Sequence, residues 1–242
     1  MSEMQNHYTP SRSWAPPTPD EETLTTAKRQ SIALEKLMSY YKCALTILES
    51  KFNVLNEEYA FETERAPISS IKVRLKTLPS ITSKLERKGL PVTLENIETK
   101  LHDVAGIRVI CSFPEDVYQM ADAFLKQDDI TLLEKKDYIA HPKESGYRSL
   151  HLIVSLPVFL SKEKRMVTVE VQLRTIAMDF GASLEHQLRY KKDVDFTQEM
   201  ADELFQCAKV SAELDQRMDR LRKKVAVKKI SQPIGQEKSN HA

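Results

Sequence analysis

The sequence has few cysteines and no long hydrophobic run. Its 242 residues contain three widely spaced cysteines, Cys43, Cys111 and Cys207, and no C-x-x-C pair. An odd, scattered set of cysteines argues against a disulfide framework or a zinc site and predicts buried thiols in a reducing compartment. No run of about 18 apolar residues could span a bilayer, and the N-terminus carries no hydrophobic signal segment. We therefore expect a soluble, cytoplasmic protein with no membrane partner.

A large excess of charge of either sign is also missing. The chain has 36 basic and 35 acidic residues, for a net charge of +1, and gives no strong signal for nucleic-acid binding. Its length and 41% hydrophobic content are enough to bury one core. The predicted organisation is a flexible N-terminal arm (1–22), a globular domain (23–195), a C-terminal helix (196–230) and a flexible tail (231–242).

Hydrophobic periodicity predicts alternating helices and strands. An amphipathic helix is expected over 25–61, where residues such as Leu34, Leu37, Tyr41 and Leu45 recur on one face. The remaining expected elements are a strand from Ile71, a helix over 78–88 ended by Gly89, a short helix before Asp103, a strand over 106–112, a helix over 115–125, strands over 130–138 and 150–156, and a strand through Glu170.

The segment Arg165–Tyr190 carries the strongest functional signal. It begins as a strand with Val167, Val169, Val171 and Leu173 on one side and Thr168, Glu170, Gln172 and Arg174 on the other. The polar side aligns a possible metal ligand or base, a neutral hydrogen-bonding amide and a forked donor shaped for phosphate. On this strand alone, a catalytic face and a solvated face are equally good interpretations.

Three upstream segments place further charged side chains at strand ends. Asp103 precedes a buried strand that Arg108 interrupts, and a polar loop over 137–151 contains Lys143, Tyr147, Arg148 and His151. From Ile71 onward, basic residues alternate with apolar ones. Two carboxylates, several cations and an aromatic ring suit a site for polyphosphate and Mg²⁺.

Four motifs occur in the order found in one known family. They are R-x-K…S-x-x-x-K, D-x-A-G-I-R, D-Y-I-x-x-P-K-x-S-G-Y-R-S-L-H and E-V-Q-L-R-T. The chain resembles the synthetase domain of the RelA/SpoT family and, more narrowly, the stand-alone small alarmone synthetases of bacteria, over about half its length. The resemblance implies an α/β (α+β) fold like that of nucleotidyltransferases: a mixed, mostly antiparallel sheet flanked by helices, with long helices at both ends.

The same resemblance implies a reaction. The family transfers the β,γ-pyrophosphate of ATP to the 3′-hydroxyl of GTP or GDP, making (p)ppGpp and releasing AMP, and here no hydrolase half is expected. Glu170 matches the essential glutamate, which implies that it accepts the hydroxyl proton and helps to hold Mg²⁺. Asp103 matches the other Mg²⁺ ligand, although its position alone would favour a turn cap.

The ATP site implied by the resemblance consists of Arg74, Lys76, Ser80, Lys84 and Arg108. Arg74 and Arg108 match two arginines that sandwich adenine, a contact that suits the flat guanidinium. The other three match residues that hold the phosphates. Two of these, Ser80 and Lys84, lie one turn apart near a helix start, whose positive end favours anions.

The GTP/GDP site implied by the resemblance consists of Lys136, Lys143, Tyr147, His151, Gln172, Arg174 and Asp179. Tyr147 matches a tyrosine that stacks on guanine. Asp179 lies where an acid would read the guanine edge by accepting from N1–H and the 2-amino group. One departure is Gly181, where relatives often carry tryptophan; glycine inside a helix costs about 1 kcal/mol relative to alanine.

The C-terminal helix carries two seven-residue repeats. They are Leu204, Ser211, Met218 and Val225, and Cys207, Leu214 and Leu221. The pattern fits packing on the catalytic domain and contact between subunits equally well. The resemblance favours the second interpretation and implies a homotetramer.

Two other functions remain open from the sequence. A related pyrophosphokinase could act on adenine nucleotides or on the 3′ end of tRNA; the near-neutral charge and Asp179 argue against it. A catalytically silent nucleotide- or RNA-binding regulator would gain little from keeping both Asp103 and Glu170 beside a polyphosphate.

Overall fold

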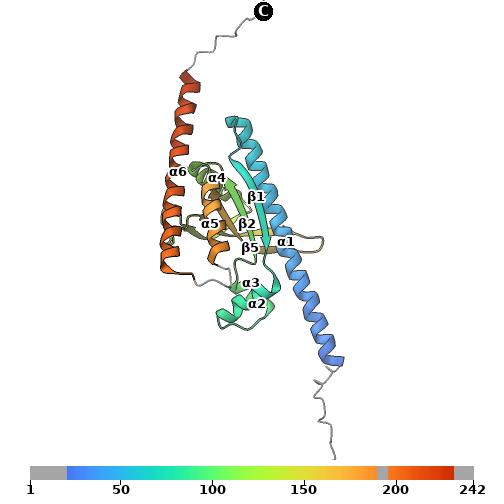
Figure 1. The fold of residues 1–242 in the computed structure, drawn as a ribbon. Coiled ribbons are helices and arrows are strands. Elements are labelled where there is room, and N and C mark those ends of the chain that lie inside the picture. The colour runs from blue at the N-terminus through green and yellow to red at the C-terminus, as the bar shows by residue number, and fades with distance from the viewer. Residues whose placement is uncertain (1–20, 190–195, 232–242) are drawn as a thin grey trace, which may run out of the picture. The chain divides into compact units, whose positions relative to one another are not determined.

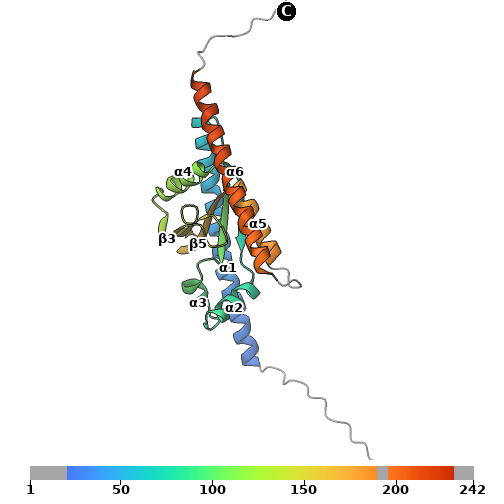
Figure 2. The ribbon, with the colours of Figure 1, turned by 60° about the vertical axis from the view of Figure 1, so that its left-hand side comes forward.

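The computed structural model describes residues 21–189 and 196–231 (Figures 1 and 2). The elements are α1 (Glu21–Thr63), β1 (Ile68–Leu75), α2 (Leu78–Arg87), α3 (Leu94–Lys100), β2 (Ala105–Cys111), α4 (Pro114–Leu125), β3 (Thr131–Asp137), β4 (Leu150–Phe159), β5 (Lys164–Thr175), α5 (Ile176–Arg189) and α6 (Gln198–Ser231). Most of the predicted arm and tail lies outside the described residues. The chain divides into two compact units between Leu37 and Met38, and the sheet lies in the second.

The five strands form one sheet in the order β1-β2-β5-β4-β3. Only β2 and β5 run parallel, and the other three neighbouring pairs are antiparallel. The fold class expected from the sequence, a mixed and mostly antiparallel sheet flanked by helices, is therefore confirmed.

The sheet has one apolar face and one polar face. Val167, Val169, Val171 and Leu173 of β5 are all buried, as the alternation predicts. The part of α1 after Met38 and helix α4 contribute to this core, where the rings of Phe52 and Phe124 stack with centroids 4.6 Å apart. None of the described helices is long and apolar enough to cross a bilayer.

Helices α5 and α6 lie side by side (Figures 1 and 2). The first half of α6 turns Leu204, Cys207 and Ser211 toward a cavity shared with α5. The second half exposes Leu214, Met218, Leu221 and Val225, each by about half of its surface or more. Packing within the subunit therefore explains only the first half of the heptad pattern.

The cysteines differ in environment. Cys111 is buried in β2, and burial raises the pKa of its thiol to about 12. Cys43 is half-buried, whereas Cys207 is exposed. The prediction that all three are buried is wrong for Cys207, because the cavity it borders is open to solvent and leaves this side of α6 uncovered.

Candidate active site

A row of polar residues crosses all five strands. Backbone register aligns Lys72 of β1 with Arg108 of β2, Gln172 of β5, His151 of β4 and Lys136 of β3. Two residues along the same strands, and so on the same face, Gly106 pairs with Glu170. Four of the five residues in the row were predicted as site residues, and the register explains how separate motifs reach one face of the sheet.

Asp103, Lys76 and Lys84 form the Asp103 cluster. The Nζ atoms of Lys76 and Lys84 donate to the same carboxylate oxygen of Asp103, over 2.6 and 2.5 Å. Burial would raise the pKa of Asp103, but the two lysines outweigh that effect and hold its pKa below the ordinary value. The other carboxylate oxygen, Oδ1, is buried and has no hydrogen-bond partner among the described residues.

A cavity of about 220 Å³ joins this cluster to Glu170. Its lining consists of Arg74, Lys76, Asp103, Gly106, Ile107, Arg108, Glu170 and Gln172. Both arginines predicted to sandwich adenine line it, one from β1 and one from β2. Ser80, predicted to hold phosphate, lies at the start of α2 outside the lining, where its hydroxyl contacts that of Thr77 at 2.9 Å.

Five side chains form a closed hydrogen-bonded circuit, the Glu170 ring: Glu170, Gln172, Arg174, Tyr147 and His151. Glu170 accepts from Gln172 Nε2 at 2.9 Å and lies 3.2 Å from His151 Nδ1. The Tyr147 hydroxyl lies 2.8 Å from His151 Nε2. One terminal nitrogen of Arg174 closes the circuit by donating to Tyr147 at 2.6 Å and to Gln172 at 2.8 Å.

In the tautomer of His151 that carries its proton on Nδ1, the hydrogen bonds of the Glu170 ring run in one direction. Burial raises the pKa of Tyr147, so its hydroxyl stays protonated and can donate to His151. His151 then donates from Nδ1, and both arms of the ring run from the Arg174 cation to the Glu170 carboxylate. Burial would raise the pKa of Glu170, but the hydrogen bonds and charge around it lower the pKa below its ordinary value. The ring therefore holds Glu170 ionised and oriented.

Asp179 of α5 is 8% exposed and lies among cations. It contacts Lys72 Nζ at 2.8 Å, an Arg108 terminal nitrogen at 2.9 Å and Arg174 at 3.5 Å. Burial opposes ionisation, but these contacts lower the pKa of Asp179. Arg108, predicted to stack on adenine, is thus paired with the residue predicted to read guanine, and its Nε is buried without a hydrogen-bond partner.

Two predicted lysines lie next to residues of the Glu170 ring, Lys143 beside Tyr147 and Lys136 paired in register with His151. Lys143 places its Nζ 4.7 Å from the Tyr138 ring centroid and 4.9 Å from that of Tyr147. Lys136 is exposed on β3 and pairs with Glu134 at 2.9 Å, which raises its pKa. Both cations could reach an anion bound over the sheet.

The sequence interpretation missed three residues of the site. Lys72 binds Asp179, Tyr138 lies edge-on to His151 with centroids 5.3 Å apart, and Ser149 accepts from Arg174 Nε at 3.2 Å. The alternation of Lys72 with Arg74 and Lys76 already signalled its side of β1. Nothing in the local pattern marks Ser149, because its role depends on β4 pairing with β5.

The donor set can accommodate a divalent cation. Asp103 has one buried oxygen without a hydrogen-bond partner, and its charge is near enough to influence the pKa of Glu170. The described residues form no group of three or more metal-ligating side chains. Mg²⁺, however, commonly takes only one or two protein carboxylates and completes its shell with water and substrate phosphates.

The chain belongs to the RelA/SpoT family. The family model described as "Region found in RelA / SpoT proteins" matches residues 73–195, which contain both carboxylates and the whole Glu170 ring.

Particular relatives extend the similarity beyond that region. The chain is 42% identical to GTP pyrophosphokinase YwaC of Bacillus subtilis over 76% of this chain and 88% of the relative. It is 35% identical to GTP pyrophosphokinase YjbM of the same organism, over 79% and 89%. Its structure matches that of small alarmone synthetase 1 from B. subtilis bound to its product pppGpp, with a TM-score of 0.73 and 34% identity, over 80% of this chain and 98% of that one.

Proposed function

We propose that this chain is a GTP pyrophosphokinase that makes (p)ppGpp by transferring the β,γ-pyrophosphate of ATP to the 3′-hydroxyl of GTP or GDP. The observation that carries the proposal is the position of Glu170: it lines the cavity of the Asp103 cluster and is also the acceptor end of the Glu170 ring. One carboxylate is thereby shared between two differently built half-sites, as a two-substrate transfer requires.

The cavity side is assigned to ATP. Arg74 and Arg108 offer two flat cations for the adenine, and Lys76 and Lys84 offer point charges for the phosphates. Both lysines form ion pairs with Asp103. A triphosphate would compete for them, so ATP binding should release the Asp103 carboxylate. Ser80 is assigned to the ATP phosphates at the edge of this half-site.

The ring side is assigned to GTP or GDP. Tyr147 presents an aromatic face for the base. Asp179 is assigned to bind the guanine edge, and to do so it would give up part of its contacts with Lys72, Arg108 and Arg174. Lys136, Lys143 and His151 are assigned to the acceptor's phosphates and ribose. Gln172 and Arg174 orient Glu170 and Tyr147 through the hydrogen bonds of the ring.

The reaction forms a bond between the acceptor 3′-oxygen and the β-phosphorus of ATP. The bond from that phosphorus to the oxygen bridging it to the α-phosphorus breaks, and AMP leaves with the electron pair. Glu170 is assigned to take the 3′-hydroxyl proton. Its lowered pKa keeps it ionised at neutral pH, which proton acceptance and metal binding both need, although it also makes the carboxylate a weaker base.

Asp103 and Glu170 would hold the divalent ion, which we propose is Mg²⁺. When bound, Mg²⁺ would neutralise charge on the transferred phosphates. Oxygen ligands in small number, together with the unpartnered Oδ1 of Asp103, suit this hard cation better than a softer one.

We also propose that residues 23–195 act as the catalytic domain and that the chain forms a homotetramer in the cytoplasm. Val210, Leu214, Met218, Leu221 and Val225 recur at three- and four-residue steps on α6 and are 49–64% exposed. A second copy of the chain would bury such a stripe. Light scattering on purified protein should give four times the mass of one chain, and Leu214→Lys with Leu221→Lys should lower it.

The function is tested by incubating the pure protein with ATP, Mg²⁺ and one acceptor at a time: GTP, GDP, ATP or uncharged tRNA. Separation of the nucleotides should show pppGpp from GTP, ppGpp from GDP, and one AMP per product. Product on tRNA or an adenine nucleotide in preference to GTP would overturn the acceptor assignment. Binding of nucleotides with no product at all would indicate a regulator instead.

A further inference from the structure

Helix α6 touches the loop that carries Tyr147. The contact is made by Gly146, which has a positive φ of 80°. A Cβ atom placed on Gly146 would lie 2.7 Å from Cβ of Ala208 and 3.2 Å from Cδ2 of Phe205. Real Cβ atoms do not approach so closely, so the loop reaches this position only because residue 146 has no side chain and residue 208 has a small one.

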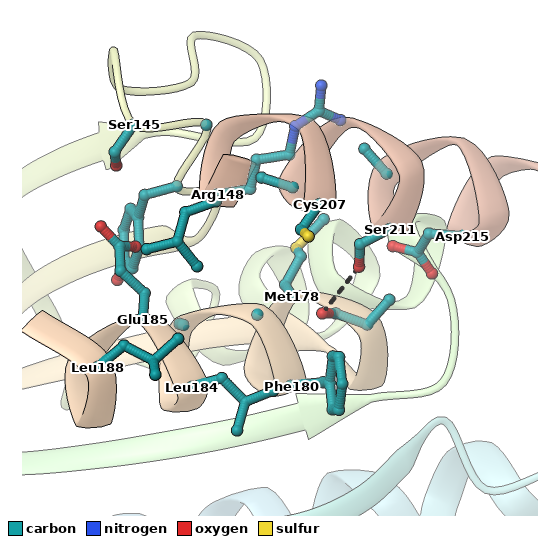
Figure 3. A pocket seen from close by; sticks show the side chains of 18 residues that line it. Ser145, Arg148, Met178, Phe180, Leu184, Glu185, Leu188, Cys207, Ser211 and Asp215 are labelled. Carbon is teal, nitrogen blue, oxygen red and sulfur yellow. Dashed lines mark hydrogen bonds between the residues drawn. The ribbon is translucent and has the colours of Figure 1, made fainter. Parts of the chain in front are cut away.

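Other contacts fix α6 in place. The hydroxyl of Ser211 donates to the carbonyl oxygen of Ala177 at 3.2 Å (Figure 3). Asp215, 7% exposed, accepts from the hydroxyl of Thr175 at 2.7 Å. Thr175 is the residue after Arg174, so this bond attaches α6 to the end of the strand that carries the Glu170 ring.

The far end of the helix is anchored as well. Arg222 donates to Glu115 of α4, and its guanidinium lies 5.1 Å from the ring centroid of Phe113. Helix α6 is thus held at the start of α5 and at α4, and it meets the loop at Ala208, about one turn before the first of these anchors.

A cavity of about 280 Å³ lies beside the Gly146 contact, between the loop, α5 and α6 (Figure 3). Ala208 itself borders this cavity, as do Ala212 one turn further along α6 and Gly181 from α5. The loop therefore packs on α6 at Ala208 and Phe205 and has open space next to this contact. Displacing the contact would move the loop and, with it, Tyr147.

We propose that Ala208, together with Gly146, positions the acceptor loop: α6 acts as the support that sets the height of Tyr147 over the sheet. The inference rests on the proposed role of Tyr147 in binding GTP or GDP. Ala208 touches neither nucleotide, so it is a positioning residue and not a catalytic one. A substitution of Ala208 should therefore weaken binding of the acceptor and not of ATP, because Lys76, Lys84 and Asp103 belong to other segments.

The test is Ala208→Leu against Ala212→Leu, the same change one turn further along α6. We expect Ala208→Leu to raise KM for GTP about 10- to 100-fold with KM for ATP within about twofold, since a displacement near 1 Å can cost a reaction about a hundredfold. Ala212→Leu extends into the cavity and should leave both KM values unchanged. An equal rise in both KM values, or the same effect from both variants, would overturn the proposal.

A second pair of variants decides the matter if Ala208→Leu folds poorly. Gly146→Ala should also raise KM for GTP, and adding Ala208→Gly should restore part of the loss by removing the opposing methyl group. Gly89→Ala controls for backbone strain, because Gly89 has a φ of 66° and open space around it. Absence of rescue by Ala208→Gly would contradict the contact. A wild-type protein that makes no (p)ppGpp would instead refute the proposed function.

Discussion

The Asp103 cluster and the Glu170 ring hold their carboxylates in different ways. In the cluster, two lysines converge on one oxygen of Asp103, and the other oxygen is left without a hydrogen-bond partner. In the ring, both oxygens of Glu170 are engaged, by His151 and Gln172, and each partner is itself held by a further residue. In the proposed function a phosphate would rearrange the charges of the cluster, whereas the ring is closed by hydrogen bonds within the protein.

Because of this difference, the Asp103 cluster and the Glu170 ring should tolerate displacement of their side chains to different degrees. Ammonium groups are compact point charges on flexible stems, so the cluster can follow a moving triphosphate. A directed hydrogen-bond circuit depends on fixed distances and angles, so small displacements matter more in the ring. We propose that this matters most at the acceptor loop, where Gly146, next to Tyr147, packs on Ala208 of α6.

Glu170→Gln should have the largest effect, because it changes the residue shared by both parts. Glutamine keeps the shape but loses the proton acceptor and the charge, so kcat should fall by about 10²–10⁴. Fluorescent analogues of both nucleotides should still bind. Retention of more than about a tenth of wild-type turnover would remove Glu170 from the role of base.

Asp179→Ala should narrow the preference for GTP over ATP as acceptor by about tenfold or more, because a single lost pair of hydrogen bonds to a base is worth roughly 1–3 kcal/mol. The comparison is kcat/KM for each acceptor in wild type and variant. Asp179→Asn is the matched control, since it retains one acceptor oxygen and should fall between the two. An unchanged preference would show that Asp179 only balances Lys72 and Arg108.

Gly181→Ala should stabilise the protein by about 1 kcal/mol, because alanine favours helix and a Cβ at this position meets nothing within 4 Å. Chemical denaturation measures the change in free energy of unfolding. Activity should stay the same, as the residue faces the α5–α6 cavity and not the row of polar residues. A loss of stability would mean that the cavity is filled in solution.

Asp215→Asn should have the smallest effect, visible as a pH dependence. Burial raises the pKa of Asp215 in the folded protein, so ionisation favours the unfolded state as the pH rises through that pKa. Asparagine cannot ionise and can still accept from Thr175. The melting temperature of the variant should therefore match wild type in acid and exceed it near neutral pH. A variant less stable than wild type at every pH would contradict this reasoning.

Sequence patterns were sufficient for the strand faces, whereas most side chains of the candidate site were named from the family resemblance. The alternation through Glu170, Gln172 and Arg174 gives their common face directly, because strand periodicity is local. Which strands are neighbours is not local. The resemblance implied that Asp103 and Glu170 act together, but the pairing of β2 with β5 came only from the structure.

Contacts between distant segments could not be predicted from the sequence either, because they too are not local. No pattern indicated that Asp179 would pair with Lys72 and Arg108, or that Ala208 of α6 would meet Gly146. The heptad pattern of α6 could not separate packing from assembly, because the same spacing serves both, and here the two halves of the helix differ.

The separation of the two half-sites is tested most directly by initial-rate kinetics on Lys84→Met and Tyr147→Ala, with ATP and GTP each varied at saturating levels of the other. Lys84→Met should raise KM for ATP and leave KM for GTP near wild type. Tyr147→Ala should do the reverse, weakening GTP by about 1–3 kcal/mol through lost stacking. Separate half-sites for ATP and GTP would be contradicted if either variant raised both KM values by the same factor, or if Lys84→Met affected GTP and Tyr147→Ala affected ATP.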